Sequence, residues 1–365
     1  MLIDHNEARE VYRELKWISE EVLRSINCRP EPDFPRRVRR WRNGRPKGIL
    51  FHYTGGASGI KALKWCNHPG WGNTGSSWHV TVFDRKPDNT AGERWDRLAD
   101  KSMQALFPVP TIINASWDLG TWHGNWSNNV CLGIENRNMG RGPSIGTAKD
   151  GTTMILDKPA VDVKGQIMKI GANVNVYESF TRGQIIANAN IGHVMTGYWN
   201  EPLDPTWMLP HHGVWATKSD TGSPFVFPIA QLRSNIVSDI SPDSGGMDLG
   251  EYPDLGHSAD DDGTWWDVEA NEVRCDLEPI VVPWDEPDAF IDQEDPNEVD
   301  RLLNRMGYHV TGDPVNRSRA VRIFQRSTSA FRKRGRARDV LKTDGVVGPK
   351  TKKALTARIA ALQLP

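Results

Sequence analysis

The sequence of 365 residues predicts a mixed α/β domain with a central sheet flanked by helices, followed by a smaller all-helical domain. Three observations lead to this fold class. Between residues 48 and 235, short apolar runs that suit buried strands alternate with stretches of helical periodicity. Residues 243–298 are dominated by Asp and Glu, which is typical of an extended linker. Residues 297–365 then return to helical spacing.

The segment before the α/β domain, residues 1–47, combines a helix with a basic connector. Leu15, Ile18 and Val22 are among the apolar residues that recur at helical spacing, which predicts an amphipathic helix over 5–27. The Pro- and Arg-rich stretch that follows is interpreted as a solvated linker. An alternative is electrostatic attachment to an acidic surface, such as a cell-envelope polymer or nucleic acid.

Within the α/β domain, three apolar runs are predicted as strands, at 48–54, 76–84 and 130–138. Residues 178–198 carry apolar positions at helical spacing, with Thr181 as the expected N-cap. The stretch between Met139 and Val176 reads as an insertion with a hairpin of its own. The four domains are therefore predicted as 1–47, 48–235, 236–296 and 297–365.

Composition excludes several classes of protein. No apolar run reaches 18 residues, so no membrane span is expected. The N-terminus lacks a basic stretch followed by an apolar core, so no signal peptide is expected and synthesis in the cytoplasm is predicted. The four cysteines form no CxxC pair and read as free thiols, with a disulfide as the alternative. The 15 Trp residues suit carbohydrate-binding clefts as well as ordinary cores. Those that fall between or beside the histidine-containing segments described below are assigned to a candidate cleft, with ordinary packing as the alternative: Trp65, Trp71, Trp117, Trp122 and Trp126.

Three histidine-containing segments carry the chemistry. Residues 51–56 read FHYTGG, a His at the end of an apolar strand just before a glycine loop. Residues 122–126 read WHGNW and are followed by LGIEN at 132–136. Residues 212–220 read HGVWATKSD. Any one of these segments is weak by itself, but the ordered set is specific.

In this order the three segments resemble the zinc-dependent N-acetylmuramoyl-L-alanine amidases of type 2. That family includes phage endolysins and the peptidoglycan recognition proteins. The resemblance covers about residues 48–235 and implies a zinc hydrolase built on a mixed sheet flanked by helices. It implies Zn²⁺ as the cofactor, with His52, His212 and Asp220 as its ligands. Two neutral imidazoles and one carboxylate leave the fourth tetrahedral position of zinc open for water.

His211 adjoins His212 and is the competing ligand. The spacing to Lys218 and Asp220 favours His212. The resemblance further implies that Glu135 is the general base and that Lys218 stabilises the oxyanion. Four residues are expected to contact substrate: His123, Trp78, Asn125 and Thr54.

The sequence departs from the family pattern at two positions. Many members have a Tyr where Trp78 stands, and an indole cannot exchange a proton as a phenol does, so that role falls to Glu135. Thr221 follows Asp220 where the family usually has Pro, which weakens the loop argument without removing a ligand. Asp rather than Cys as third ligand suits the bacterial, hydrolytic branch.

Residues 297–357 resemble the small three-helix peptidoglycan-binding domain that accompanies cell-wall hydrolases. The most specific part is the D-G-x-x-G-x-x-T turn from Asp344 to Thr351, in which glycines permit a tight turn and Thr can begin a helix. The first such turn is degraded at 312–316, and residues 330–340 look inserted. The basic charge of this segment could also serve nucleic acid, yet no nucleic-acid motif is present, so none is expected as a partner.

The function predicted from the sequence is hydrolysis of the amide between N-acetylmuramic acid and L-alanine, by a phage endolysin or a virion-associated lysin. The expected partner is bacterial peptidoglycan, together with other virion proteins if the chain is carried in a particle. The protein would act on the wall after release from the host cytoplasm or as part of the virion. The alternative is a non-catalytic peptidoglycan-recognition or virion structural protein, and a third reading keeps zinc but cuts a different peptide bond.

Overall fold

The structure is a computed structural model. It describes residues 5–30, 38–41, 44–56, 58–68, 76–142, 146–147, 153–156, 176–215, 218, 220–221, 226–237, 298–332, 341 and 343–362. No helix within these ranges is both long enough and apolar enough to cross a membrane. The acidic stretch predicted as a linker lies outside the described residues, apart from its first two positions.

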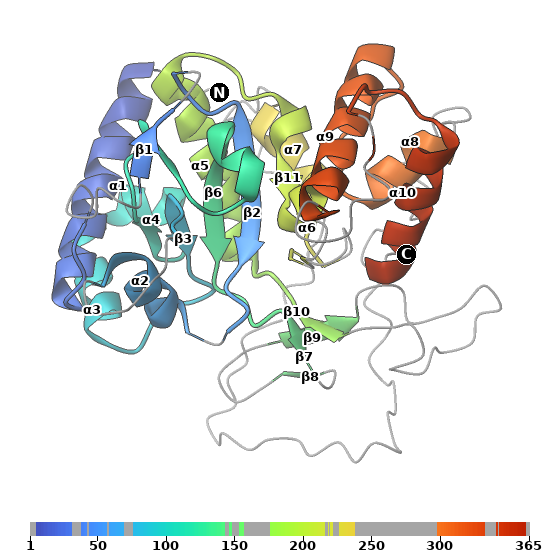
Figure 1. Cartoon of the computed structure of the whole chain (residues 1–365). Helices are drawn as coiled ribbons and strands as arrows, with labels where there is room; N and C mark the ends of the chain where they lie inside the picture. The colour runs from blue at the N-terminus through green and yellow to red at the C-terminus, as the bar shows by residue number, and fades with distance from the viewer. Residues whose placement is uncertain are drawn as a thin grey trace, which may run out of the picture.

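A five-stranded mixed sheet forms the centre of the molecule (Figure 1). Its three inner pairings, from β11 through β2 and β6 to β3, are parallel, whereas β4 pairs antiparallel with β3. In order across the sheet the strands are β11 (Leu209–Pro210), β2 (Gly48–Tyr53), β6 (Cys131–Asn136), β3 (Val80–Val82) and β4 (Thr111–Ile113). The predicted mixed α/β class is confirmed.

Smaller sheets and helices complete the fold. Strand β1 (Val38–Arg40) pairs with β5 (Leu119–Thr121) in a two-stranded sheet. A separate four-stranded sheet consists, in order, of β7 (Arg141–Gly142), β10 (Val176–Glu178), β9 (Thr153–Leu156) and β8 (Gly146–Thr147). The helices are α1 (His5–Ser25), α2 (Gly59–Asn67), α3 (Thr90–Leu98), α4 (Lys101–Leu106), α5 (Arg182–Trp199), α6 (His211–Val214), α7 (Ile229–Val237), α8 (Glu298–Arg305), α9 (Pro314–Arg332) and α10 (Pro349–Leu362), with short 3₁₀ turns at Asn125–Asn129 and Pro205–Trp207.

The pleat of the sheet separates two cores. Because successive strand side chains point to opposite faces, Ile49 and Phe51 of β2 join the larger core, which α1 and α5 line. Leu50 points the other way and joins a second cluster shared with α8, α9 and α10. His52 follows Leu50 on that second face. The alternation thus places the functional histidine on the side of the C-terminal helices.

The N-terminal helix α1 is packed into the larger core. Its apolar residues Leu15, Ile18 and Leu23 are fully buried, and each such side chain stabilises the fold by about 1.5–3 kcal/mol. Ser19 Oγ accepts a hydrogen bond of 2.8 Å from the Ile113 backbone N–H, which satisfies a donor of the edge strand β4. Tyr12 Oη likewise accepts from the Trp117 N–H at 3.1 Å. This helix therefore covers the β4 edge of the sheet.

The predicted strands correspond to observed ones with shorter bounds. The expected strands at 48–54 and 130–138 become β2 and β6, but the strand expected at 76–84 is reduced to the three residues of β3. Thr181 caps α5 in a full capping box with Gln184, as its position predicted. Cys28, Cys66 and Cys131 are buried free thiols, and Cys275 lies outside the described residues.

The tryptophans that sequence reasoning assigned to a cleft have different fates. Trp65 faces the cleft described below and is 44% exposed. Trp117 is fully buried beside Tyr12 and Trp199, so its assignment to the cleft was wrong. The Trp122 ring lies under the guanidinium of Arg39, and the Trp126 ring lies under the guanidinium of Arg326. Trp71 is outside the described residues.

Candidate metal centre and active-site cleft

The site begins with two neighbouring strands. His52 of β2 and Glu135 of β6 are direct partners in the parallel register, so their side chains leave the same face of the sheet. Both residues stand near the carboxyl ends of their strands, the edge at which open α/β sheets bind ligands. Strand pairing alone therefore brings an imidazole and a carboxylate into one site.

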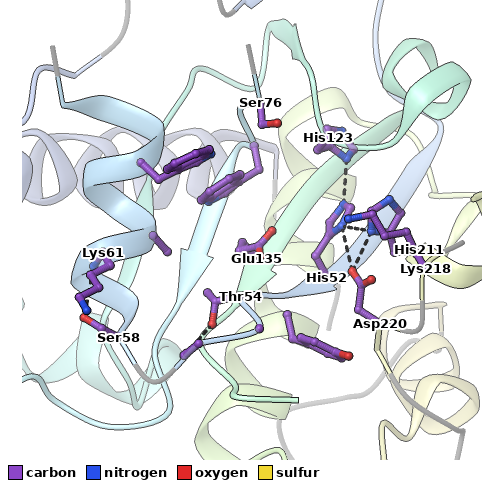
Figure 2. Close-up of a pocket in the computed structure, with 16 residues that line it drawn as sticks. His52, Thr54, Ser58, Lys61, Ser76, His123, Glu135, His211, Lys218 and Asp220 are labelled. Atoms are coloured by element: carbon purple, nitrogen blue, oxygen red, sulfur yellow. Dashed lines mark hydrogen bonds and ion pairs between the residues drawn. The ribbon is translucent and has the colours of Figure 1, made fainter. Parts of the chain in front are cut away.

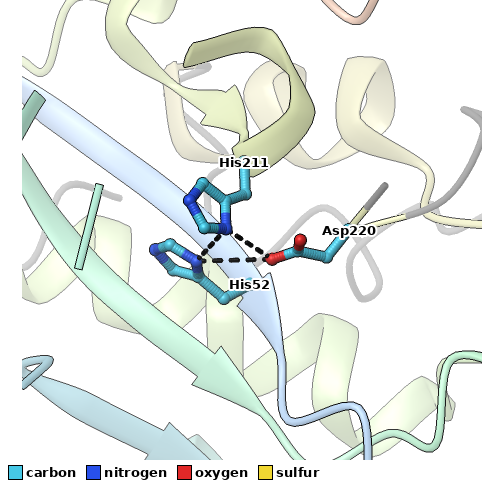
Figure 3. Close-up of side chains that lie close together, drawn as sticks. All are labelled: His52, His211 and Asp220. Atoms are coloured by element: carbon cyan, nitrogen blue, oxygen red, sulfur yellow. Dashed lines mark hydrogen bonds and ion pairs between the residues drawn. The ribbon is translucent and has the colours of Figure 1, made fainter. Parts of the chain in front are cut away.

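The other members come from α6 and the loop after it. His211 opens the single-turn helix α6, and its Nδ1 lies 2.7 Å from Asp220 Oδ2 and 2.9 Å from His52 Nδ1. The His52 Nδ1 atom lies 3.4 Å from the same carboxylate oxygen. Figure 3 shows the three side chains converging on one point, and all three are buried. Such a group could hold a metal ion.

The donor set fits zinc. Two imidazole nitrogens and one carboxylate oxygen are ligands that zinc takes in catalytic sites, where a fourth position is left open. Tetrahedral geometry with bonds of about 2.1 Å sets neighbouring ligand atoms roughly 3.4 Å apart. The three separations observed here are equal to that value or slightly shorter. Only a small outward movement of the side chains is needed to admit the ion.

The proton positions in this site follow from a chain of hydrogen bonds that ends on the backbone. His123 Nε2 faces the Cys131 carbonyl at 3.1 Å and must donate to it, so His123 Nδ1 is an acceptor. His52 Nε2 lies 3.0 Å from that acceptor and must carry a hydrogen. The lone pair of His52 is therefore on Nδ1, the atom that faces His211 and Asp220. Gly133 makes room for this arrangement, since a Cβ there would lie 2.6 Å from the His123 ring.

Replacing His123 with phenylalanine is expected to weaken zinc binding by about 10–100-fold, because the residues that orient metal ligands have effects of that size. Phenylalanine keeps the ring but removes the acceptor for His52 Nε2–H. Competition with a chromophoric chelator measures the affinity. Zinc affinity equal to that of the wild type would contradict the orienting role. Replacing His68, a half-buried residue at the end of α2 that does not line the cleft, in the same way provides the control.

The candidate metal group differs from the predicted ligand set at one position, because His211 rather than His212 lies with His52 and Asp220. His212 Nε2 lies 3.0 Å from the Met306 carbonyl, and its Nδ1 lies 3.2 Å from the Asp220 carbonyl. Both of its nitrogens are thus directed at backbone oxygens. Its own N–H also donates to the Asp220 carbonyl at 2.8 Å. His212 consequently ties the loop to α6.

Charge within the site is set by burial and by these contacts. Burial, together with the neighbouring His211, lowers the pKa of His52 to about 4, so the imidazole is neutral at pH 7. Burial would raise the pKa of Asp220, but His211 and His52 outweigh it and hold that pKa well below its usual range. An ionised carboxylate and neutral imidazoles are the forms that bind a metal.

A cleft of about 700 Å³ opens beside the three ligands (Figure 2). Glu135 lies between the ligands and the α2 side of the cleft, where Ser58 and Lys61 stand. Burial raises the pKa of Glu135 well above its ordinary value, and the charge of Asp220 adds to this effect. Lys218 lines the same cleft from the loop before Asp220. The two residues predicted to be catalytic therefore share one cavity with the ligands.

The residues predicted to contact substrate are placed as follows. His123, Thr54 and Trp78 line the cleft, although each is engaged in protein contacts. Thr54 Oγ1 lies within 3.0 Å of the Gly56 and Asn138 carbonyls, and Trp78 Nε1 donates to Thr81 Oγ1. Asn125 lies in a 3₁₀ turn and its side chain is outside the described residues.

Sequence reasoning missed part of the lining: Tyr53, Ser58, Lys61 and Ser76. Only Tyr53 had a signal, because it directly follows the ligand His52. The other three stand on α2 or on the chain before β3, and only the tertiary fold brings those segments to the cleft. Lys61 supplies a cation on the wall opposite the ligands (Figure 2).

His79 has a structural role between three neighbouring segments. Its Nε2 donates to the Leu119 carbonyl at 2.7 Å, while its Nδ1 accepts from the Gly133 N–H at 2.9 Å and faces the Thr121 hydroxyl at 3.0 Å. In the neutral form of the ring, one nitrogen donates and the other accepts, so both are hydrogen-bonded and neither is left to take up a proton. Burial accordingly lowers the pKa of His79 to about 3.

This histidine is expected to make the fold sensitive to acid. The pKa of His79 is about 3 in the folded protein and about 6.5 in the unfolded chain, so below pH 6.5 only the unfolded chain binds a proton at this residue. The free energy of unfolding therefore decreases as pH falls from about 6.5 toward 3. Between pH 7 and pH 5 this costs roughly 2 kcal/mol. Urea unfolding at both pH values tests it, with His79→Gln as the comparison; an equal loss in both proteins would contradict the assignment.

Comparisons with known proteins add little. No protein-family model matches the chain, and no curated protein matches it. A solved structure, the complex of the N-acetylmuramyl-L-alanine amidase AmiD from E. coli with anhydro-N-acetylmuramic acid-L-Ala-D-gamma-Glu-L-Lys, aligns over 88% of this chain and 91% of that chain. The TM-score is 0.36 and the identity 14%. Likeness at this level carries no functional weight, so the side chains of the site must do so.

Proposed function

We propose that the chain is a zinc-dependent N-acetylmuramoyl-L-alanine amidase that acts on peptidoglycan. The observation that carries this proposal is the buried His52–His211–Asp220 group, which shares one cleft with Glu135 and Lys218. The ordered motifs in which four of these five residues stand supply the substrate class by resemblance. A protein that only binds the wall has no need of a metal site, a base and a cation together.

In the proposed reaction, water adds to the lactyl carbonyl of N-acetylmuramic acid and the bond to the L-alanine nitrogen breaks. Zinc, when held by His52, His211 and Asp220, polarises the carbonyl and favours ionisation of water. Glu135 accepts the proton of the attacking water and passes it to the departing amine. Its raised pKa suits a carboxylate that both takes and returns a proton. Lys218 stabilises the negative charge on the carbonyl oxygen.

The chain's own contacts prepare the groups for this reaction. The chain of hydrogen bonds from Cys131 through His123 to His52 leaves the lone pair of His52 on Nδ1. The His52 ring therefore has the orientation and tautomer that metal binding requires before the ion arrives. The hydrogen bonds from His212 hold the Asp220 backbone. Trp65 and Trp78 offer apolar wall on the α2 side, where a sugar ring or a stem peptide can pack.

Digestion of purified wall sacculi tests the proposal. The zinc-loaded protein should release L-alanine amino termini without releasing reducing sugars, and mass spectrometry should find intact stem peptides separated from intact glycan. Protein stripped with a chelator is the matched control and should be inactive until zinc is returned. Reducing ends would indicate a glycosidase, and fragments cut within the stem would indicate a different peptidase. Sacculus binding with zinc content near zero would favour the non-catalytic alternative.

We further propose that the protein serves as a phage endolysin or a virion-associated lysin, with residues 297–365 as a peptidoglycan-binding domain. The D-G-x-x-G-x-x-T turn supports the second assignment: Gln325 Nε2 bonds to the Val346 carbonyl at 2.9 Å and to Thr351 Oγ1 at 3.2 Å, which ties this turn to α9. Co-sedimentation of the metal-free protein with sacculi tests wall binding apart from cleavage. Protein that stays in the supernatant would refute that role for the segment.

A further inference from the structure

The loop that carries Lys218 and Asp220 starts from a very short helix. Helix α6 has four residues, and a helix end leaves its last carbonyl groups without partners inside the helix. Inside the loop the Lys218 N–H donates to the Trp215 carbonyl at 3.0 Å. The carbonyls of Gly213 and Lys218 need donors from elsewhere. A loop of this kind is held only if another part of the protein supplies them.

The C-terminal helices supply these donors. Tyr308 Oη, just after α8, donates to the Gly213 carbonyl. Arg358 of α10 donates through Nη2 to the Lys218 carbonyl at 2.9 Å and also reaches the Trp215 carbonyl at 3.5 Å. The bond from His212 to the Met306 carbonyl runs across the same boundary. The helix and loop that carry two metal ligands are thus tied to a segment about 90–140 positions further along the chain.

Apolar packing brings the same surfaces together. Leu50 and Val214 from the sheet side share one cluster with Met306, Tyr308 and Phe324 from the C-terminal helices. Figure 1 shows α9 beside α6, and the two helices are in contact. Arg233 of α7 adds a buried donor to the Gly307 carbonyl. The boundary is a packed core rather than a loose domain contact.

The Arg358 guanidinium is directed at the loop after α6. Within the part of the chain that the structure describes, its guanidinium has no ion pair, and it donates hydrogen bonds to the loop carbonyls of Trp215 and Lys218. Burying part of a charged guanidinium costs free energy unless its N–H groups find acceptors. The two loop carbonyls are those acceptors, so Arg358 and the loop hold each other in place. The Lys218 ammonium itself is exposed and lies 6.0 Å from the Trp215 ring, so its placement depends on its backbone.

We propose that Arg358 is a positioning residue for Lys218, through which the C-terminal helices complete the active site of the catalytic domain. This inference rests on the proposed function, because it assigns Lys218 a role in the reaction. It gives the C-terminal segment a task in the chemistry in addition to any binding of the wall. The guanidinium holds the loop, and the loop sets the height of the ammonium over the scissile carbonyl.

The test compares three variants of the full-length, zinc-loaded protein. Arg358→Met keeps the aliphatic stem and removes the donors, Arg358→Lys restores one donor, and Lys353→Met is the matched control on an exposed position of α10. The methionine variant should lower kcat by about 10–100-fold with KM within twofold of the wild type, because misplacement of a catalytic group by about 1 Å has effects of that size. The lysine variant should recover part of the loss, and the control should match the wild type.

A second measurement reports on the loop without using the amidase reaction. Trypsin cleaves after lysine, and the peptide ending at Lys218 can be followed by mass spectrometry. Cleavage there should be several-fold faster in Arg358→Met than in the wild type, with zinc still bound at one equivalent. If the wild-type protein leaves the muramoyl amide intact, the proposed function fails, yet this measurement still decides whether Arg358 holds the loop.

Three outcomes would overturn the inference. The first is wild-type cleavage after Lys218 in Arg358→Met. The second is a rise in KM with kcat unchanged, which would assign Arg358 to wall binding. The third is equal kcat loss in the methionine and lysine variants together with the same loss of Tm, which would reduce Arg358 to a general contribution to stability.

Discussion

Replacing His211 with alanine is expected to abolish stoichiometric zinc binding, with affinity reduced by more than about 100-fold. Loss of a residue that merely orients a ligand costs about 10–100-fold, and His211 belongs to the candidate metal group itself. The variant also leaves Asp220 and His52 with a donor missing between them. Metal analysis after dialysis, followed by chelator competition, measures the effect.

The neighbouring residue provides the matched control. His212→Gln keeps a side chain that can bond to the Met306 carbonyl, and it is expected to retain one equivalent of zinc. Its cost should appear in the free energy of unfolding, at about 1–3 kcal/mol, because glutamine cannot also reproduce the contact that His212 Nδ1 makes with the Asp220 carbonyl. If His212→Gln loses zinc while His211→Ala keeps it, the ligand set drawn from the structure is wrong and the set favoured by spacing is right.

Glu135→Gln is expected to lower kcat for release of L-alanine amino termini by about 10²–10⁴-fold, the range that general acid–base groups supply. Glutamine has nearly the same shape, so the cleft and the metal ligands should be unaffected and zinc should stay bound. Glu135→Asp keeps the carboxylate but withdraws it, and should retain partial activity. Activity within threefold of the wild type in Glu135→Gln would exclude the residue as the base.

The pH dependence of the wild type gives an independent check on Glu135. A general base works in its ionised form, so activity should fall as pH falls through its pKa. Because burial raises that pKa, the acidic limb should lie above the ordinary range of glutamate, about 4–4.5. A limb that shifts in Glu135→Asp and disappears in Glu135→Gln is assigned to this carboxyl group.

Much of the scaffold could be predicted because it depends on local patterns. Apolar runs found β2 and β6, and the helical spacing before residue 27 found α1. The position of His52 at the end of one run and Glu135 at the end of another placed both near the carboxyl ends of strands. Parallel pairing then makes them neighbours. Thr181 was recognised as a cap because its chemistry is local.

Other features could not be predicted, because they depend on which segments meet in space. Nothing in the sequence around Trp117 and Trp65 distinguishes a core residue from a cleft residue. In the structure Trp117 is enclosed by α1 and α5, whereas Trp65 borders the cleft. The contact of Arg358 with Lys218 joins residues 140 positions apart, and no spacing rule reaches that far. The hydrogen bond that fixes the His52 tautomer depends on the absence of a side chain at Gly133.

The sequence by itself determined the class of site: histidines and an aspartate suited to zinc, a glutamate on the adjacent strand, and a lysine near the closing ligand. The tertiary structure decided which of two adjacent histidines lies with His52 and Asp220 in the candidate metal group. Neighbouring residues on a helix point about 100° apart, so only one of the pair can face His52. The Met306 carbonyl, which the C-terminal helices bring to α6, holds His212 and leaves His211 to the metal site.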